Sequence, residues 1–132
     1  MIARSPPAAR GIADAAADPA VIDEDHLARM TLGDRALERE VLEIFVRQTV
    51  ILLERIAKAD PAFAAGAAHT LSGSANGIGA TRVAQAAERL EQAARAKASS
   101  AEFDGAVEAL KAATVEASAA ITARLGSALR DH

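Results

Sequence analysis

Apolar residues recur at helical spacing along most of the chain. The longest such pattern begins at Asp34 and continues for about six turns, interrupted by one glutamine. Its members are Leu37, Val41, Ile44, Phe45, Gln48, Ile51, Leu52 and Ile56. Val46, Val50 and Leu53 widen the apolar face, so this segment is predicted to be the main core helix, with neighbours on more than one side.

A short helix is predicted before this segment. Asp23, Glu24 and Asp25 supply the negative charge typical of a helix N-terminus, and Gly33 ends the pattern. Leu27 and Met30 follow three residues apart, on one helix face. Residues 1–20 show no helical periodicity and are interpreted as a flexible leader, so the predicted bundle domain spans residues 21–132.

Three further helices are predicted. Asp60 and Pro61 suit the cap and first turn of one helix, and a second begins near Ala80 or Thr81. The buried face of this second helix is predicted at Val83, Ala87, Leu90 and Ala94. A turn over 97–100 leads to the last helix, from about Ala101, with core positions Phe103, Val107, Leu110, Thr114, Ala117, Ile121 and Leu125. Four long helices with short links predict an all-α fold, an antiparallel four-helix bundle with a short additional N-terminal helix.

Composition narrows the possible functions. The chain has 36 alanines but only 3 Phe and no Trp or Tyr, which favours close helix packing and provides little aromatic surface for stacking. The net charge of -3 gives no attraction to nucleic acid or to an anionic membrane. The absence of cysteine excludes disulfides and thiol nucleophiles. Without a signal sequence or an apolar membrane span, the expectation is a cytoplasmic protein that binds neither nucleic acid nor membrane.

Residues 60–80 place one histidine apart from the apolar residues. With His69 at zero on a helical wheel, the apolar stripe falls at roughly 120° to 200°. This stripe comprises Phe63, Ala67, Leu71, Ser74 and Ile78. Within roughly 60° of the histidine every residue is small or polar, namely Ala62, Ala65, Gly66, Ser72, Gly73 and Asn76. His69 is therefore predicted to point away from the core, among small neighbours.

Two glycines on this face, Gly66 and Gly73, argue for a role beyond folding. Each costs roughly 0.5–1 kcal/mol relative to alanine inside a helix. Their absence of side chains would let another macromolecule approach the imidazole closely, and a neutral imidazole is a competent nucleophile whose phosphoramidate can pass the group on. A helix contact at Gly73 and a solvated Asn76 are the plainer alternatives. The pattern indicates a phosphoryl acceptor at His69.

The same residues carry a family resemblance. His69-Thr70-Leu71-Ser72-Gly73-Ser74, followed by Gly79-Ala80 and then Glu88-Arg89-Leu90-Glu91, resembles the histidine phosphotransfer (HPt) domains of bacterial phosphorelays. The resemblance implies a four-helix bundle that carries phosphate on one imidazole nitrogen, commonly Nε2. It also implies exchange of that phosphate with the aspartate of response-regulator receiver domains, and a hybrid histidine kinase as a further partner. The magnesium of the reaction belongs to the receiver, so no metal or other cofactor is expected here.

One position departs from the family pattern. Ser72 stands where these domains usually have lysine, so a cation that would screen the phosphoryl group is missing. Three alternatives follow: a less stabilised phosphohistidine, a charge supplied by Arg82, or a charge supplied by the receiver's own lysine, which is the favoured one.

Three functions are compatible with these features. The leading hypothesis is a non-enzymatic phosphocarrier, since the chain has no Gly-rich phosphate loop and no Walker-type lysine. The alternative is a receiver-binding adaptor that keeps the fold but not the phosphate, for which Ser72 is the best argument. A histidine kinase dimerisation domain is least favoured, since it would need an ATP-binding domain after His132. One accessible histidine on a closed bundle needs no partner subunit, so a monomer is expected.

The remaining candidate residues concern docking. Gln48, Leu27 and Met30 are predicted as possible parts of the receiver-docking surface, with a surface glutamine and core packing as the alternatives. Glu88 and Glu91 are predicted on an outer solvated face and are given no catalytic role. His26 and His132 are interpreted as solvated surface residues, and Gly77 and Gly79 as structural glycines that end the helix.

Overall fold

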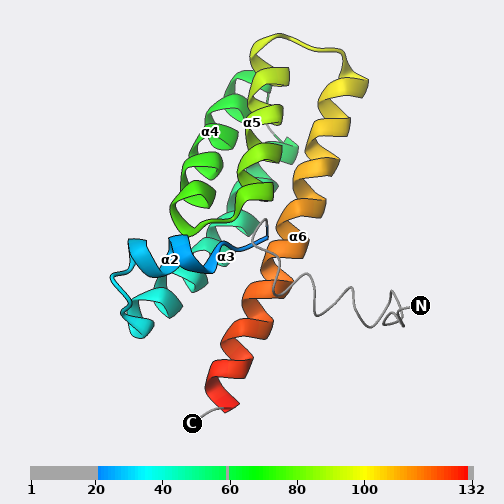
Figure 1. Ribbon diagram of the computed structural model, residues 1–132. Helices are drawn as coiled ribbons and strands as arrows, with labels where there is room; N and C mark the ends of the chain where they lie inside the picture. The colour runs from blue at the N-terminus through cyan, green and yellow to red at the C-terminus, as the bar shows by residue number, and fades with distance from the viewer. Residues whose placement is uncertain (1–20, 59, 131–132) are drawn as a thin grey trace, which may run out of the picture.

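A computed structural model describes residues 21–58 and 60–130 as an all-α bundle (Figure 1). Five helices lie in this part of the chain: α2 (Glu24–Met30), α3 (Arg35–Lys58), α4 (Pro61–Ile78), α5 (Thr81–Arg95) and α6 (Ser100–Arg130). Across these described ranges there is no strand. The predicted four-helix bundle with a short N-terminal helix is confirmed, whereas the predicted leader 1–20 lies outside the described residues.

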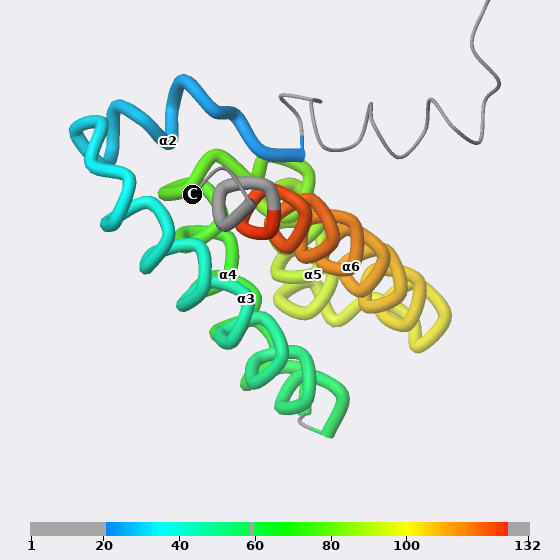
Figure 2. Tube along the Cα trace, turned by 90° about the horizontal axis from the view of Figure 1, so that it is seen from below, coloured from blue at the N-terminus to red at the C-terminus, as the bar shows by residue number. Residues whose placement is uncertain are grey.

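The four long helices pack in sequence order around the bundle. α3 packs against α4, α4 against α5 and α5 against α6, and α6 closes the ring by packing against α3. The view from below shows α2 as a separate arm across one end of the bundle (Figure 2). There it contacts α4, near the turn that joins α4 to α5. Consecutive long helices run antiparallel, and α4 lies between α3 and α5 (Figure 1).

Local sequence signals fix the ends of α4. The Asp60 side chain caps the helix by accepting a hydrogen bond from the Phe63 N–H at 2.9 Å, with Pro61 in the first turn as predicted. Gly79 ends the helix in the left-handed region, at φ 80°. Its carbonyl accepts a hydrogen bond from the Asp23 N–H at 2.9 Å, which ties the start of α2 to the α4–α5 turn.

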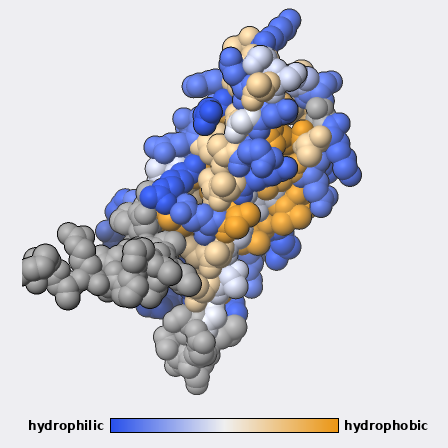
Figure 3. Space-filling view, turned by 90° about the vertical axis from the view of Figure 1, so that its right-hand side faces the viewer, coloured by the Kyte–Doolittle hydropathy of each residue, from blue (hydrophilic) through white to orange (hydrophobic). Residues whose placement is uncertain are grey.

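The core consists of aliphatic side chains and many alanines. Leu42, Leu71, Leu90, Leu110 and Ile121 are fully buried. Many buried positions of α4 and α5 are alanines, which suits the close packing of these two helices, namely Ala64, Ala65, Ala68, Ala84, Ala87 and Ala94. The predicted buried face of α5 is confirmed. On α6 the predicted positions from Val107 to Ile121 are buried, whereas Phe103 and Leu125 at the two ends are partly buried. The side of the molecule on which α6 lies shows hydrophilic surface interspersed with hydrophobic surface (Figure 3).

The predicted buried face of α3 is partly wrong. Of the predicted positions, Phe45 and Ile56 are buried, whereas Leu37, Ile44 and Ile51 are exposed. The other buried positions of α3 are Glu38, Leu42 and Thr49. Apolar residues occupy most sides of this helix, so periodicity alone does not choose among them. Packing against the other helices buries the side of α3 centred near Phe45, and the neighbouring apolar stripe stays at the surface.

Two smaller predictions are also corrected. Phe63, expected in the buried stripe of α4, is exposed because it lies in the first turn, beside the exposed end of α3. His26, interpreted as solvated, is only partly exposed. Its Nε2 atom is buried and has no hydrogen-bond partner within the described residues.

One ion cluster joins α2, α3 and α6. Arg124 donates to Glu38 at 2.6 Å and to Glu24 at 3.0 Å, and Thr31 donates to Glu38 at 3.4 Å. Burial opposes the charge of Arg124, but the contacts with Glu38 and Glu24 outweigh it and raise its pKa above the ordinary value. None of the described helices is long and apolar enough to span a membrane.

Candidate functional site

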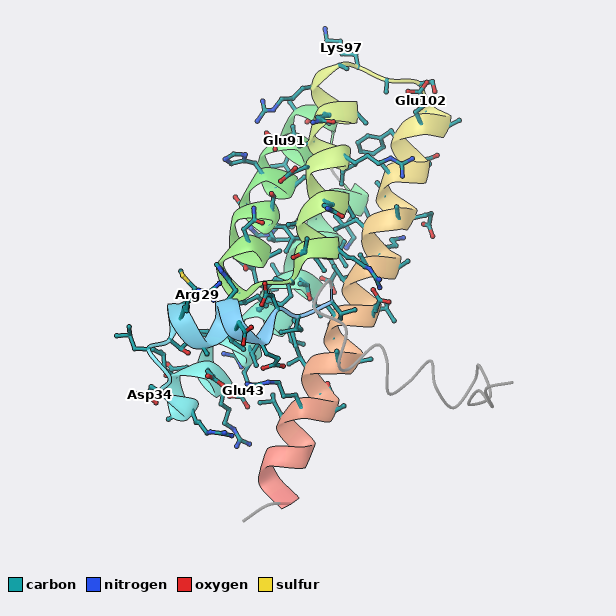
Figure 4. All side chains as sticks on the ribbon, viewed as in Figure 1. Arg29, Asp34, Glu43, Glu91, Lys97 and Glu102 are labelled. Atoms are coloured by element: carbon teal, nitrogen blue, oxygen red, sulfur yellow. The ribbon has the colours of Figure 1, made fainter. Side chains whose placement is uncertain are left out.

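His69 projects from the middle of α4 into solvent. Its side chain is 74% exposed, as the helical wheel predicted. Its Nδ1 atom lies 3.2 Å from Oε1 of Glu91. Figure 4 shows Glu91 on α5, where that helix runs beside α4. The imidazole therefore has one nitrogen in contact with a neighbouring helix, and its Nε2 has no hydrogen-bond partner among the described residues.

Glu91 is itself held by a cation. Arg95, one helical turn further along α5, donates from Nε to Glu91 Oε2 at 2.9 Å. This hydrogen bond is the main cause that lowers the pKa of Glu91 below its ordinary value. The hydrogen bond and charge of His69 lower it further, against the effect of desolvation. Glu91 is therefore ionised at neutral pH.

The state of Glu91 determines the tautomer of His69. An ionised carboxylate carries no proton and can only accept, so Nδ1 of His69 must donate. A neutral imidazole then has its lone pair on Nε2, the nitrogen that faces solvent. In its neutral form, His69 thus presents an oriented nitrogen lone pair to solvent, and this is the form that attacks an electrophile.

The histidine stands at the edge of a polar hollow between α4 and α5. The residues that line this hollow are His69, Ser72, Gly73, Asn76, Glu88, Glu91, Gln92 and Arg95. Apart from Gly73, each carries a hydrogen-bonding or charged side chain. Within the described ranges, no cluster of three or more acidic or histidine side chains has the arrangement of a metal site.

Four predicted site residues lie around this histidine, but not in the same way. Gly66 and Gly73 are exposed, and a Cβ atom added at either would meet nothing within 4 Å. Asn76 is also exposed. Ser72 is buried, because α5 covers that side of α4, and it donates to Glu88 at 3.5 Å. Ala65, predicted on the open face, is buried for the same reason.

The three predicted docking residues differ in exposure. Leu27 is fully buried, so its packing role is the one observed, whereas Met30 is 57% exposed. Gln48 is half-buried on α3. It belongs to the same helical stripe as the exposed Ile44 and Ile51. This stripe, defined here as Ile44, Gln48 and Ile51, leaves an apolar strip of α3 at the surface.

Two residues of the site were missed. Glu91 was placed on a solvated face without a role, yet its side chain is only 18% exposed and contacts His69. Arg95 was not considered. Arg82, one of the predicted sources of positive charge, instead donates to Glu116 on α6 at 2.9 Å. The spacing of Glu91 and Arg95, four apart on one helix, was the available signal of a paired carboxylate.

Fold and site together define a four-helix bundle with an oriented histidine on its surface. The chain belongs to the Hpt domain family, whose family model matches residues 40–124. Hpt domains are phosphocarrier modules of two-component signalling, distinct from kinases, and they interact with receiver domains and kinases in phosphorelays. No curated protein and no solved structure matched the chain. The match begins within α3 and ends at Arg124, so α2 lies outside it.

Proposed function

We propose that this chain carries a phosphoryl group on Nε2 of His69 and exchanges it with the aspartate of response-regulator receiver domains. A hybrid histidine kinase is the proposed source of the phosphate. The observation that carries the proposal is the contact between His69 Nδ1 and the ionised Glu91, which places the lone pair of the neutral ring on Nε2, in an exposed side chain. The family membership supports the same chemistry.

The proposed transfer needs no proton to leave the ring. The Nε2 lone pair attacks the phosphorus of the receiver's aspartyl phosphate. An N–P bond forms, the P–O bond to the aspartate breaks, and the aspartate departs as a carboxylate. Nδ1 keeps its proton, so the phosphorylated ring is cationic, and Glu91 lies where it stabilises that charge. The reverse step returns the phosphoryl group to an aspartate.

A second candidate function is a receiver-binding adaptor that does not use phosphate. Ser72 favours it, because the buried hydroxyl bonds to Glu88 and offers no positive charge to a phosphoryl group. The orientation of His69 by Glu91 favours the carrier, since a pure adaptor has no use for an oriented nucleophile. We therefore place the carrier first.

Phosphate transfer from a receiver separates the two functions. A receiver domain phosphorylated with labelled phosphate is mixed with the wild-type chain, and label is expected on the chain as an acid-labile, base-stable phosphoramidate. Peptide mapping is expected to place it on His69. Binding of the receiver without any label on the chain would instead establish the adaptor function.

We also propose that Gly66 and Gly73 provide the clearance for a docked receiver. The exposed Met30 and the α3 stripe of Ile44, Gln48 and Ile51 are the proposed apolar contacts of the same surface. The open space above both glycines supports this role.

A bulky side chain at Gly73 tests the clearance. Gly73→Leu is expected to slow transfer from a phosphorylated receiver by about 10- to 100-fold, because a displaced donor no longer reaches Nε2 in line. Its thermal midpoint is expected to equal or exceed that of the wild type, since glycine inside a helix is unfavourable. Gly105→Leu, at an equally open position on α6, is the matched control and is expected to transfer normally. Equal transfer rates in both variants would contradict the clearance role.

A further inference from the structure

The charges around His69 do not favour a phosphoryl group. Glu88 and Glu91 lie three residues apart on one face of α5, and both line the hollow beside the histidine. Arg95 is the only lysine or arginine that lines it, as far as the described residues go. The hollow therefore holds two carboxylates against one guanidinium.

The single cation is already engaged. Arg95 donates to Glu91 at 2.9 Å, so its charge is largely shared with that carboxylate. In the described part of the chain, no lysine or arginine pairs with Glu88 in this way. Its recorded contact is the hydroxyl of Ser72, which donates from α4, three residues after His69. Ser72 thus draws a negative group, and not a positive one, toward the surface on which the phosphoryl group would sit.

We propose that Glu88 raises the free energy of phosphorylated His69 and so sets the exchange equilibrium toward the receiver's aspartyl phosphate. This inference rests on the proposed function and adds to it the direction in which phosphoryl exchange is favoured. Glu88 is neither nucleophile nor acid in this scheme, and Ser72 is its positioning residue.

The charge balance of the transfer gives the reason. Attack by Nε2 moves a group of about two negative charges from the aspartate to the ring, while the ring gains one positive charge and the aspartate regains its negative charge. Glu91, in contact with Nδ1, interacts with the positive ring. Glu88, which lines the same hollow, would face the phosphoryl oxygens, and like charges repel. This repulsion exists when the phosphoryl group is on His69 and is absent when the group is on the receiver's aspartate.

The equilibrium constant of exchange is the property to measure. Wild-type chain and phosphorylated receiver are brought to equilibrium, and both phosphorylated species are quantified. This constant depends on the free species alone, so altered docking does not change it. Glu88→Gln keeps an acceptor for Ser72 but removes the charge, and it is expected to shift the constant toward phosphohistidine by about threefold to tenfold. The shift is expected to shrink in high salt.

Two further variants complete the test. Glu108→Gln removes an exposed carboxylate from α6, which does not line the hollow, and is expected to leave the constant unchanged. Ser72→Lys removes the hydroxyl contact and adds a cation, and is expected to shift the constant in the same direction as Glu88→Gln, by a larger factor. If Glu88→Gln matches Glu108→Gln, or shifts the constant toward the receiver, the proposed effect of Glu88 is wrong.

A receiver-independent measurement separates this inference from the proposed function. Phosphoramidate can phosphorylate the histidine chemically, and phosphorus NMR then follows the hydrolysis of the phosphohistidine at neutral pH, where Glu88→Gln has lost a charge and the adduct persists. Loss of the phosphoryl group relieves its repulsion from Glu88, so the phosphohistidine is expected to last longer in Glu88→Gln than in the wild type. Identical lifetimes in the two proteins would overturn the inference even if receiver transfer proceeds. Failure of a receiver to label the wild type would refute the proposed function instead.

Discussion

Replacing His69 with glutamine is expected to abolish phosphate acceptance. Glutamine has a similar size and a polar end, but its amide nitrogen is not a nucleophile, so no N–P bond can form. Label transferred from a phosphorylated receiver is expected to fall below detection, a loss of about a thousandfold or more by comparison with the removal of other catalytic nucleophiles.

The same substitution is expected to leave the fold intact. The His69 side chain is 74% exposed and its one recorded contact is with Glu91, so the free energy of unfolding is expected to change by less than about 0.5 kcal/mol. Urea unfolding of both proteins measures this. His26→Gln, on α2, is the control histidine and is expected to accept label normally. If His69→Gln were labelled to the same level as the wild type, the phosphate would be carried by another residue.

Gly79→Ala is expected to have the largest effect on stability. Gly79 has φ 80°, a conformation that costs a residue with a Cβ atom about 1–2 kcal/mol. The added Cβ would also lie 2.9 Å from the carbonyl oxygen of Asp23, a backbone atom that cannot move alone. Together these effects are expected to destabilise the protein by about 2–4 kcal/mol.

The loss is expected to be concentrated at α2. The Asp23 N–H donates to the Gly79 carbonyl, so displacement of this turn is expected to speed hydrogen exchange at Asp23 and Leu27 before the rest of the bundle is affected. Gly77→Ala, two residues earlier, is the matched control. Nothing lies within 4 Å of a Cβ at that position, and a gain of about 0.5–1 kcal/mol is expected. A Gly79→Ala protein as stable as the wild type would contradict this account of the turn.

Helix ends were predictable because short sequences determine them. Asp60 caps α4 and Gly79 ends it in the structure as the sequence indicated, since a side-chain acceptor and a left-handed residue act locally. The buried faces of α5 and α6 were predictable for a related reason. Their large apolar residues fall mainly on one face, so only one orientation buries them.

The orientation of α3 was less predictable because its apolar residues surround the helix. Ile44, Phe45 and Val46 are consecutive, and only Phe45 is fully buried. Which of the three faces inward depends on where α4 and α6 lie, and helical periodicity within one segment does not contain that information. Of the positions that the pattern selected, Leu37, Ile44 and Ile51 remained exposed, whereas Phe45 and Ile56 are buried.

The residues of the candidate site likewise fall into those that one helix reveals and those that depend on packing between helices. His69 and the open glycines were found from α4 alone, because they share one face of one helix. Glu91 contacts His69 across 22 positions of sequence, and the contact depends on the relative shift of α4 and α5 along their axes. The buried state of Ser72 depends on that packing as well. Contacts between helices were therefore the part that the sequence pattern did not reveal.

The ion cluster of Arg124 bears on where this domain can be cut. Arg124 is the last residue of the family match, and it lies beyond the fully buried core position Ile121. A fragment trimmed at the end of the core would keep the helices that surround His69 but would leave Glu38 buried without its guanidinium. Glu24 would lose the same partner. A cut near the end of α6 would therefore weaken the attachment of α2, although Glu24 and Arg124 lie 100 positions apart in the sequence. Fragments intended for binding studies should therefore extend past Arg124.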